Sequence, residues 1–196
     1  MKALKLLAAV FTAMTLLSAC KESPGTAEPP KQAKAAPVSI AAIEAEARGF
    51  TVGSAMSVRT VYVFFDPQCP HCAQLWQWAK PLKSQAKFVW IPVGLISKTS
   101  EAQGATLLAA KDPVSAMDQH EASIMAKTGG ISASGDTEAL KAAVVKNTAL
   151  MTRFGFASVP SIVALHAQTG ALVTREGGLP TPALAGFLGL QVPAGQ

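Results

Sequence analysis

The sequence predicts a single α/β domain, and three observations carry that prediction. A hydrophobic strand runs directly into a helix near residue 70, a long helical stretch follows a second strand, and the chain finishes with two strands and a helix. The 196 residues are enough for one domain with a hydrophobic core. With 49% hydrophobic and 15% charged residues, the composition is typical of a globular protein.

The centre of the prediction is residues 60–85. The run TVYVFF at 60–65 is rich in β-branched and aromatic residues and predicts a buried strand, which Asp66 and Pro67 end. A helix is predicted from Pro70 to Gln85, because proline is tolerated in a first helical turn. Pro81 lies deeper in this helix and should kink it.

The remaining elements follow in order. We expect a short helix from about residue 39 that Gly49 ends, since glycine favours helix C-termini. We then expect a strand at 88–95, helices over about 97–154, strands at 159–167 and 171–178 joined by a turn, and a helix at 180–190.

The first 38 residues have a different character. Residues 1–19 combine Lys2 and Lys5 with an apolar run too short to span a membrane, which indicates a signal peptide. The ending Leu-Ser-Ala-Cys resembles a bacterial lipobox, so Cys20 is expected to be lipidated; the alternative is ordinary cleavage after Ala19. Residues 20–38 then form a flexible tether, and residues 39–196 the domain.

Charge excludes one class of partner. Loss of Lys2 and Lys5 from the formal charge of +5 leaves 15 basic against 12 acidic residues. No basic run alternates with aromatic residues, so the sequence predicts no nucleic-acid partner.

The short segment Cys69-Pro70-His71-Cys72 carries the chemistry. With Cys20 assigned to lipid, these are the two remaining cysteines of a chain expected in an oxidising compartment. A structural zinc site needs four ligands, and no further histidine lies close in sequence. A structural disulfide over two residues would close too small a loop to stabilise the fold much. A redox pair is therefore favoured, and no metal site is predicted.

The predicted helix distinguishes the two sulfurs. Cys69 is placed at the exposed N-terminus of the helix, where free N–H groups and the helix dipole stabilise a thiolate, and a cationic His71 would act in the same direction. We therefore expect Cys69 to be the attacking sulfur with a lowered pKa and Cys72 the resolving one.

Several motifs together resemble a known family. VYVFFDPQCPHCAQLWQWAKP, LLAAKDP followed by QHEAS, VPSIVAL and GGLP are similar to the catalytic domain of the DsbC/DsbG family of periplasmic thiol:disulfide interchange proteins, with the DsbG members nearest. The resemblance covers about residues 58–190. It implies a thioredoxin-like fold with a helical insertion, at about 97–154, between the CxxC helix and a strand led by a cis-proline.

The resemblance also implies residue roles. Cys69 would be the nucleophile and Cys72 the resolving thiol, with His71 beside them. Pro160 would be the cis-proline facing the pair, and the Val159 backbone would pair with an extended substrate near Pro70.

This sequence departs from the family pattern in two ways, and it differs from thioredoxin itself in a third. About forty residues separate Cys20 from the first expected strand, so no dimerisation domain is expected and a monomer is predicted. His71 and Val159 are the choices associated with strongly oxidising DsbA-type proteins. Residue 63 is Val where thioredoxin has a buried acid, so that proton acceptor for Cys72 is missing.

The sequence leaves the roles of two neighbouring residues open. Asp66 could tune Cys69, shuttle protons or cap the strand end. Trp76 could flank the substrate or, as we favour, pack against the helical insertion.

The expected function is a lipid-anchored oxidoreductase of the bacterial periplasm, with the outer membrane favoured because Lys21 follows Cys20. It would oxidise cysteine-containing or unfolded envelope proteins through a Cys69–Cys72 disulfide, with no other cofactor, and a membrane redox partner would recycle the pair. The alternatives are a reductase or isomerase of the DsbG type and, from another class, a copper or zinc carrier using Cys69 and Cys72.

Overall fold

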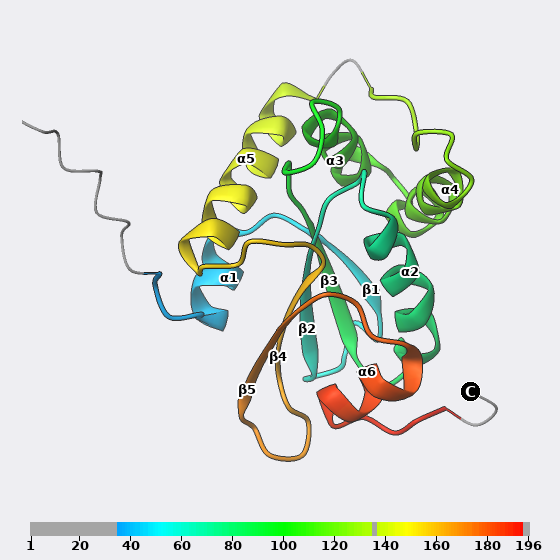
Figure 1. The fold of residues 1–196 in the computed structure, drawn as a ribbon. Coiled ribbons are helices and arrows are strands. Elements are labelled where there is room, and N and C mark those ends of the chain that lie inside the picture. Colours follow the sequence, from blue (N-terminus) through cyan, green and yellow to red (C-terminus); the bar gives the residue numbers. More distant parts are fainter. Residues whose placement is uncertain (1–34, 135–136, 194–196) are drawn as a thin grey trace, which may run out of the picture. The chain divides into compact units, whose positions relative to one another are not determined.

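The computed structural model describes residues 35–134 and 137–193. The elements in chain order are α1 Ile40–Glu46, β1 Phe50–Gly53, β2 Thr60–Phe65, α2 Pro70–Ala79, the 3₁₀ helix η1 Lys80–Leu82, β3 Lys87–Pro92, α3 Ser100–Ala109, α4 Pro113–Met125, α5 Glu138–Arg153, β4 Ser161–Leu165, β5 Leu172–Glu176 and α6 Thr181–Leu188 (Figure 1). The predicted signal peptide, Cys20 and most of the predicted tether lie outside the described residues.

One mixed sheet organises the domain. Its five strands have the order β1-β3-β2-β4-β5, in which β2 and β3 are parallel and the other neighbours antiparallel. Val63 of the central strand β2 is paired with Trp90 of β3 on one side and Ile162 of β4 on the other. The carboxyl end of β2, where α2 begins, is therefore held between two strands.

The central strand supplies side chains to both faces of the sheet. Successive residues of a strand point to opposite faces. Accordingly Val61, Val63 and Phe65 join the hydrophobic cluster on one face, and Tyr62 and Phe64 join the cluster on the other. This is why the TVYVFF run is almost continuously hydrophobic.

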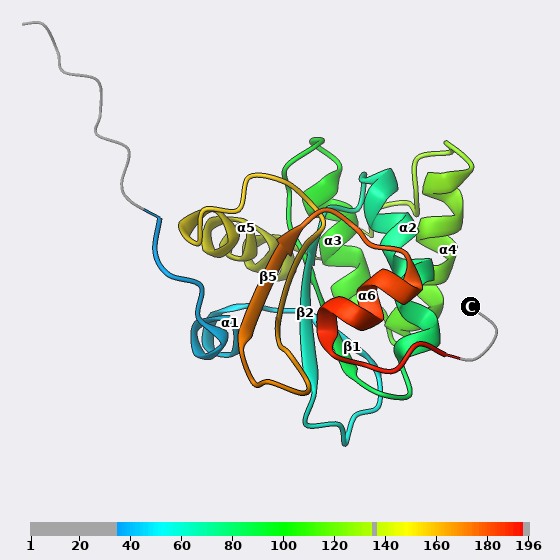
Figure 2. The ribbon, with the colours of Figure 1, turned by 60° about the horizontal axis from the view of Figure 1, so that its bottom comes forward.

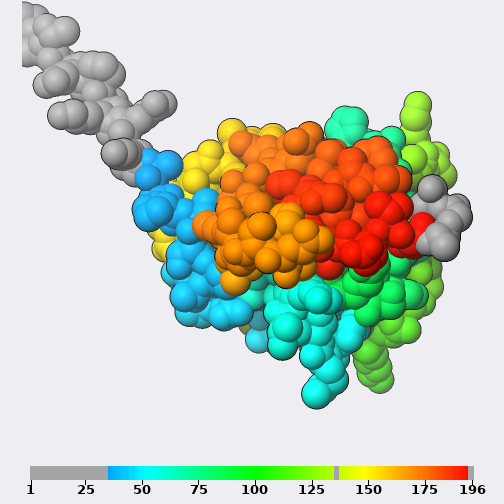
Figure 3. All heavy atoms as spheres, turned by 90° about the horizontal axis from the view of Figure 1, so that it is seen from below, coloured from blue at the N-terminus to red at the C-terminus, as the bar shows by residue number. Residues whose placement is uncertain are grey.

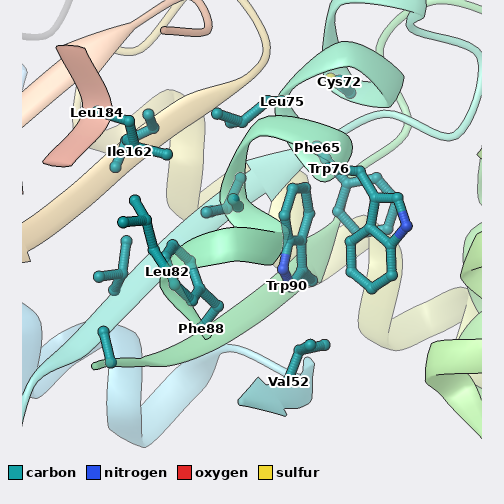
Figure 4. Packing of buried hydrophobic residues seen from close by; sticks show 14 of the residues in the cluster. Val52, Phe65, Cys72, Leu75, Trp76, Leu82, Phe88, Trp90, Ile162 and Leu184 are labelled. Carbon is teal, nitrogen blue, oxygen red and sulfur yellow. The ribbon is translucent and has the colours of Figure 1, made fainter. Parts of the chain in front are cut away.

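Helices cover both faces (Figures 1 and 2). The helices α2 and α6 pack over one face, where the cluster includes Leu75, Trp76, Trp90 and Leu184, and Figure 4 shows Cys72 in the first turn of α2 above this cluster. The helices α1 and α5 pack over the other face, around Ile43 and Met151.

The helical insertion between β3 and β4 has the predicted position and consists of three helices. Helix α5 packs against β3 and α1, α3 packs against α5, and α4 packs against α2. The insertion therefore covers one face of the sheet and also adds a second layer beside the CxxC helix (Figure 1).

Two local predictions are wrong. The helix that begins at Pro70 ends at Ala79 and continues as the 3₁₀ helix that contains Pro81, so the proline shortens the α-helix where a kink was expected. Gly49 does not end α1, which is already complete at Glu46. A Cβ at Gly49 would lie 2.6 Å from the Trp90 carbonyl oxygen, so this glycine permits the close approach of the chain to β3.

At the end of the sheet that lies away from the first turn of α2, C-terminal segments of the domain lie beside an N-terminal one. Figure 3 views this side, where the β4–β5 hairpin and α6 gather beside the cyan β1–β2 connection. Within residues 35–134 and 137–193, no helix combines the length and the hydropathy needed to cross a membrane.

Candidate active site

Cys69 and Cys72 occupy the first turn of α2. Cys69 is the N-cap residue, with extended backbone angles of φ −96° and ψ 110°, and its Sγ accepts a hydrogen bond from the Cys72 N–H at 3.2 Å. A cap side chain satisfies N–H groups that have no partner within the helix. The Cys69 sulfur therefore takes the place of a capping oxygen, and the N–H it accepts from favours the thiolate.

The two thiols differ in acidity. The pKa of Cys69 is lowered to about 7, although burial raises it. The largest cause is a hydrogen bond from the Cys72 thiol, followed by the N–H groups of Cys72 and His71 and then by the charge of His71. Burial first, and then the nearby Cys69, raise the pKa of Cys72 well above that of a free thiol. Of the two sulfurs, Cys69 is therefore the one that ionises near neutral pH.

The expectation that Cys69 is exposed is wrong. The residue is 3% exposed and Cys72 is 0% exposed, whereas Pro70 and His71 between them are exposed. The loop before β4 covers Cys69. The Cys69 thiol lies 3.6 Å from the carbonyl oxygen of Val159 in this loop and can donate a hydrogen bond to it.

The Val159–Pro160 peptide bond is cis, as the resemblance implied. The bond lies immediately before β4, which pairs with β2, so the sheet brings this loop against the start of α2. His71, on the exposed side of the pair, places its Nδ1 3.2 Å from Oε1 of Gln74.

Asp66 is a structural cap. Its buried carboxylate accepts hydrogen bonds from the N–H groups of Leu95 at 2.6 Å, Ile96 at 2.9 Å and Gln68 at 2.8 Å, and from the Ser100 hydroxyl at 2.7 Å. It joins the end of β2 to the β3–α3 connection, so of the roles left open by the sequence the structure shows strand-end capping.

Two further residues, which the sequence analysis did not assign, fix the loop before Cys69. Gln68 donates from its amide to Gln103 and to the Gly129 carbonyl oxygen. The buried His120 of α4 lies 2.7 Å from the Pro67 carbonyl oxygen through Nε2, and its Nδ1 accepts from the Ile131 N–H at 3.1 Å. The insertion therefore holds the active-site loop from the side.

Trp76 packs against the insertion, as favoured. Its indole N–H donates to Asp118 of α4 at 2.7 Å, and Lys80 also contacts Asp118 at 2.6 Å. Glu121, one turn further along α4, is 0% exposed. A sequence signal for its burial exists: the hydrophobic residues Met117 and Ile124, four before and three after it, share its helix face, and the structure shows that both are buried.

Metal ligands are sparse around the pair. In the described part of the chain, no three His, Cys, Asp or Glu side chains come together in a group able to hold a metal ion. His120 and His166 lie on different elements, and both ring nitrogens of His120 already have partners.

A CxxC pair at the start of the helix after the central strand, with a cis-proline loop against it, is the arrangement of the thioredoxin-like class. A family model described as a thioredoxin-like domain matches residues 53–189, and the chain belongs to that family.

Among curated proteins the chain is similar to two proteins named thiol:disulfide interchange protein DsbG. It is 37% identical to that of Pseudomonas aeruginosa over 143 residues, which are 70% of this chain and 54% of the relative. It is 38% identical to that of Escherichia coli over 104 residues, 52% of this chain and 42% of the relative. The matched region spans about half the length of each relative. The resemblance to DsbG is therefore confirmed.

The solved structures extend the similarity of the fold. The catalytic domain of Proteus mirabilis ScsC matches with a TM-score of 0.56 at 17% identity, over 76% of this chain and 96% of that one. The predicted thioredoxin-like fold is confirmed.

Proposed function

We propose that the protein is a thiol:disulfide oxidoreductase that exchanges disulfides with client proteins through Cys69 and Cys72. The observation that carries the proposal is the asymmetry of the pair: the pKa of Cys69 is lowered to about 7, and that of the fully buried Cys72 is raised. In disulfide exchange the thiolate is the attacking species. Cys69 therefore forms the mixed disulfide with a client, and Cys72 resolves it.

Trapping of mixed disulfides tests this assignment. Cys72→Ser should accumulate client proteins bound to Cys69, since no second thiol remains to release them, and Cys69→Ser should accumulate none. Trapping by Cys69→Ser alone would reverse the roles. Stoichiometric copper or zinc on the purified reduced protein, without trapping, would favour the carrier function instead.

The direction proposed is oxidation of clients. The capping N–H groups and the charge of His71 stabilise the reduced, thiolate form, and a stabilised reduced form makes a disulfide a better oxidant. A client thiolate attacks Cys69 in the disulfide, and a second client thiol then releases the oxidised client and leaves both enzyme cysteines reduced.

The second candidate is the reducing or isomerising direction. It is favoured by the Cys69 pKa of about 7, which is close to that of thioredoxin, and by the identity to DsbG. Equilibration of the Cys69–Cys72 couple with glutathione decides: a potential clearly above about −270 mV, the thioredoxin value, supports the oxidase, and one at or below it the reductase.

The proposed site of action is the periplasm, where the domain is anchored to the outer membrane through lipid on Cys20 and tethered by residues 20–38. The signal-like leader and the lipobox-like ending of residues 17–20 support it. In a Gram-negative host Cys20→Ala should lose fatty-acid labelling, and persistent labelling would remove the anchor from the proposal.

Clients in this compartment are cysteine-containing or unfolded envelope proteins, and a membrane redox protein recycles the pair. We propose that the domain acts as a monomer. Light scattering of the soluble chain from residue 37 should return a single chain mass at micromolar concentration; twice that mass would contradict the proposal.

A further inference from the structure

The side chain of Glu121 is buried in α4 without a polar partner. The residue is 0% exposed, and neither carboxylate oxygen has a hydrogen-bond partner within the described residues. An unpaired charge in such a place is costly, so the group is neutral in most conditions, and a buried carboxyl of this kind requires an explanation.

Two contacts place the part of α4 that carries Glu121 near the cysteine pair. Asp118 of α4 accepts from the indole N–H of Trp76 in α2, and His120, further along α4, contacts the Pro67 carbonyl oxygen before α2. This part of α4 therefore lies against both α2 and the loop that leads into it.

Helical spacing completes the placement. Glu121 follows Asp118 by three residues and Cys72 precedes Trp76 by four, so each lies on the same helix face as a residue of the Asp118–Trp76 contact, one turn away from it. Glu121 and Cys72 thus lie on the faces by which α4 and α2 pack together, and Met117, one turn before Glu121, belongs to the same hydrophobic cluster as Cys72.

The charges of the site are coupled accordingly. Burial, and after it the negative charge of Cys69, raise the pKa of Glu121 to about 9. The Glu121 carboxylate is in turn one of the causes that raise the pKa of Cys72.

Titratable groups on the elements around Glu121 either have polar partners of their own or lie away from it. Lys80 of η1 is paired with Asp118, Asp66 accepts four hydrogen bonds, and both nitrogens of His120 have partners. Glu101 of α3 is exposed and lies against Gly94.

We propose that Glu121 is the proton acceptor and donor for Cys72 during disulfide exchange. The inference rests on the proposed function and adds to it the fate of a proton at a buried thiol. It assigns to the insertion helix a part in the chemistry that residue 63, a valine in β2, cannot play.

The step is balanced as follows. In the mixed disulfide between Cys69 and a client, the Glu121 carboxyl no longer faces the Cys69 charge and loses its proton to solvent. The Cys72 thiol then gives its proton to the Glu121 carboxylate. The Cys72 sulfur then bonds to the Cys69 sulfur as the bond from Cys69 to the client sulfur breaks, and the client leaves as a thiolate. Cys69 and Cys72 are oxidised to a disulfide, the client is reduced, and Glu121 holds the proton. In the oxidising direction each event runs in reverse, and Glu121 returns the proton to Cys72 as it leaves.

The charge on Cys69 determines when Glu121 can accept this proton. In the mixed disulfide Cys69 carries no charge, so the electrostatic contribution that raises the pKa of Glu121 disappears. The carboxyl therefore ionises more readily at the stage at which Cys72 has to lose its proton.

The test uses the full mature chain with Cys20→Ser, so that only the active-site thiols react. One equivalent of 5,5′-dithiobis(2-nitrobenzoate) is added to the reduced protein. Attack by Cys69 releases the first nitrothiobenzoate, and attack by Cys72 on the mixed disulfide releases the second in a phase independent of protein concentration. In Glu121→Gln the second phase at pH 7 should be at least tenfold slower, and the first should stay within twofold of wild type.

Glu138→Gln is the matched control, because Glu138 is an exposed acid of α5 that pairs with Lys141; both phases should match wild type. A second phase that is unchanged or faster in Glu121→Gln would overturn the inference, and a faster one would mean that the carboxylate only repels the Cys72 thiolate. Absence of the first phase in wild type would instead count against the proposed function.

If Glu121→Gln does not fold, wild-type protein with ¹³C-labelled glutamate replaces it. The side-chain carboxyl of Glu121 should titrate at lower pH in the oxidised than in the reduced protein, since oxidation removes the Cys69 charge. Equal midpoints in the two states would overturn the inference.

Discussion

At the scale of single residues, the acidity of Cys69 comes mostly from its partner in the pair. The Cys72 thiol is the largest cause that lowers the Cys69 pKa to about 7, and the charge of His71 is the smallest. Cys72→Ala should therefore raise the Cys69 pKa toward the free-thiol value of about 8.5, and His71→Tyr should raise it less, because the backbone N–H groups remain. Ultraviolet absorbance of the thiolate against pH measures both. A larger shift in His71→Tyr would give the imidazole the leading role.

The sequence predicted the two sulfurs well and their surroundings poorly. Strand, Asp-Pro and CxxC are contiguous, so the position of Cys69 at a helix start is a local property. The role of Asp66 is not, because its partners Leu95, Ile96 and Ser100 lie about thirty residues further along the chain. The burial of Cys69 likewise depends on the Val159 loop, 90 residues away.

At the scale of elements, α4 stabilises the active-site loop through His120. His120→Leu should leave the Pro67 carbonyl and the Ile131 N–H buried without partners, at about 1–3 kcal/mol for each group. His120→Gln can donate to the first and accept from the second, so it should retain most of the stability. Urea unfolding of both variants checks this, and equal losses would show that only the shape of the ring matters.

Most helices and strands were predictable from the sequence, and the four-residue strand β1 was not. The helices of the insertion and the strands β2, β3, β4 and β5 follow from their hydrophobic patterns. The strand β1 was missed, since four residues with two buried positions give too short an alternation to recognise. It forms because β3 needs a partner on its outer edge and the chain after α1 lies there.

At the scale of the molecule, the topology gathers a site from three distant regions. Cys69 follows the central strand, Val159 precedes β4, and Glu121 comes from the insertion between β3 and β4. Pairing of β4 with β2 brings the first two together, and packing of α4 on α2 adds the third. The meeting of Cys69 and Val159 could be expected from the order of elements. The position of Glu121 depends on which helix of the insertion covers α2.

Stability of the whole reduced domain should depend on pH through Glu121. Its folded-state pKa is raised from 4.5 to about 9, so between these values the folded protein holds a proton that the unfolded chain has lost, and stability falls as pH rises. Glu121→Gln cannot ionise and should be more stable than wild type at pH 8 by about 1 kcal/mol or more, with a difference that shrinks toward zero near pH 4.5 and grows by at most about 1.4 kcal/mol per pH unit above it. Urea unfolding under reducing conditions at pH 5 and pH 8 measures this difference directly. Glu138→Gln should show no such trend, because that carboxylate is exposed, and a pH-independent difference for Glu121→Gln would mean that Glu121 is already ionised in the folded protein.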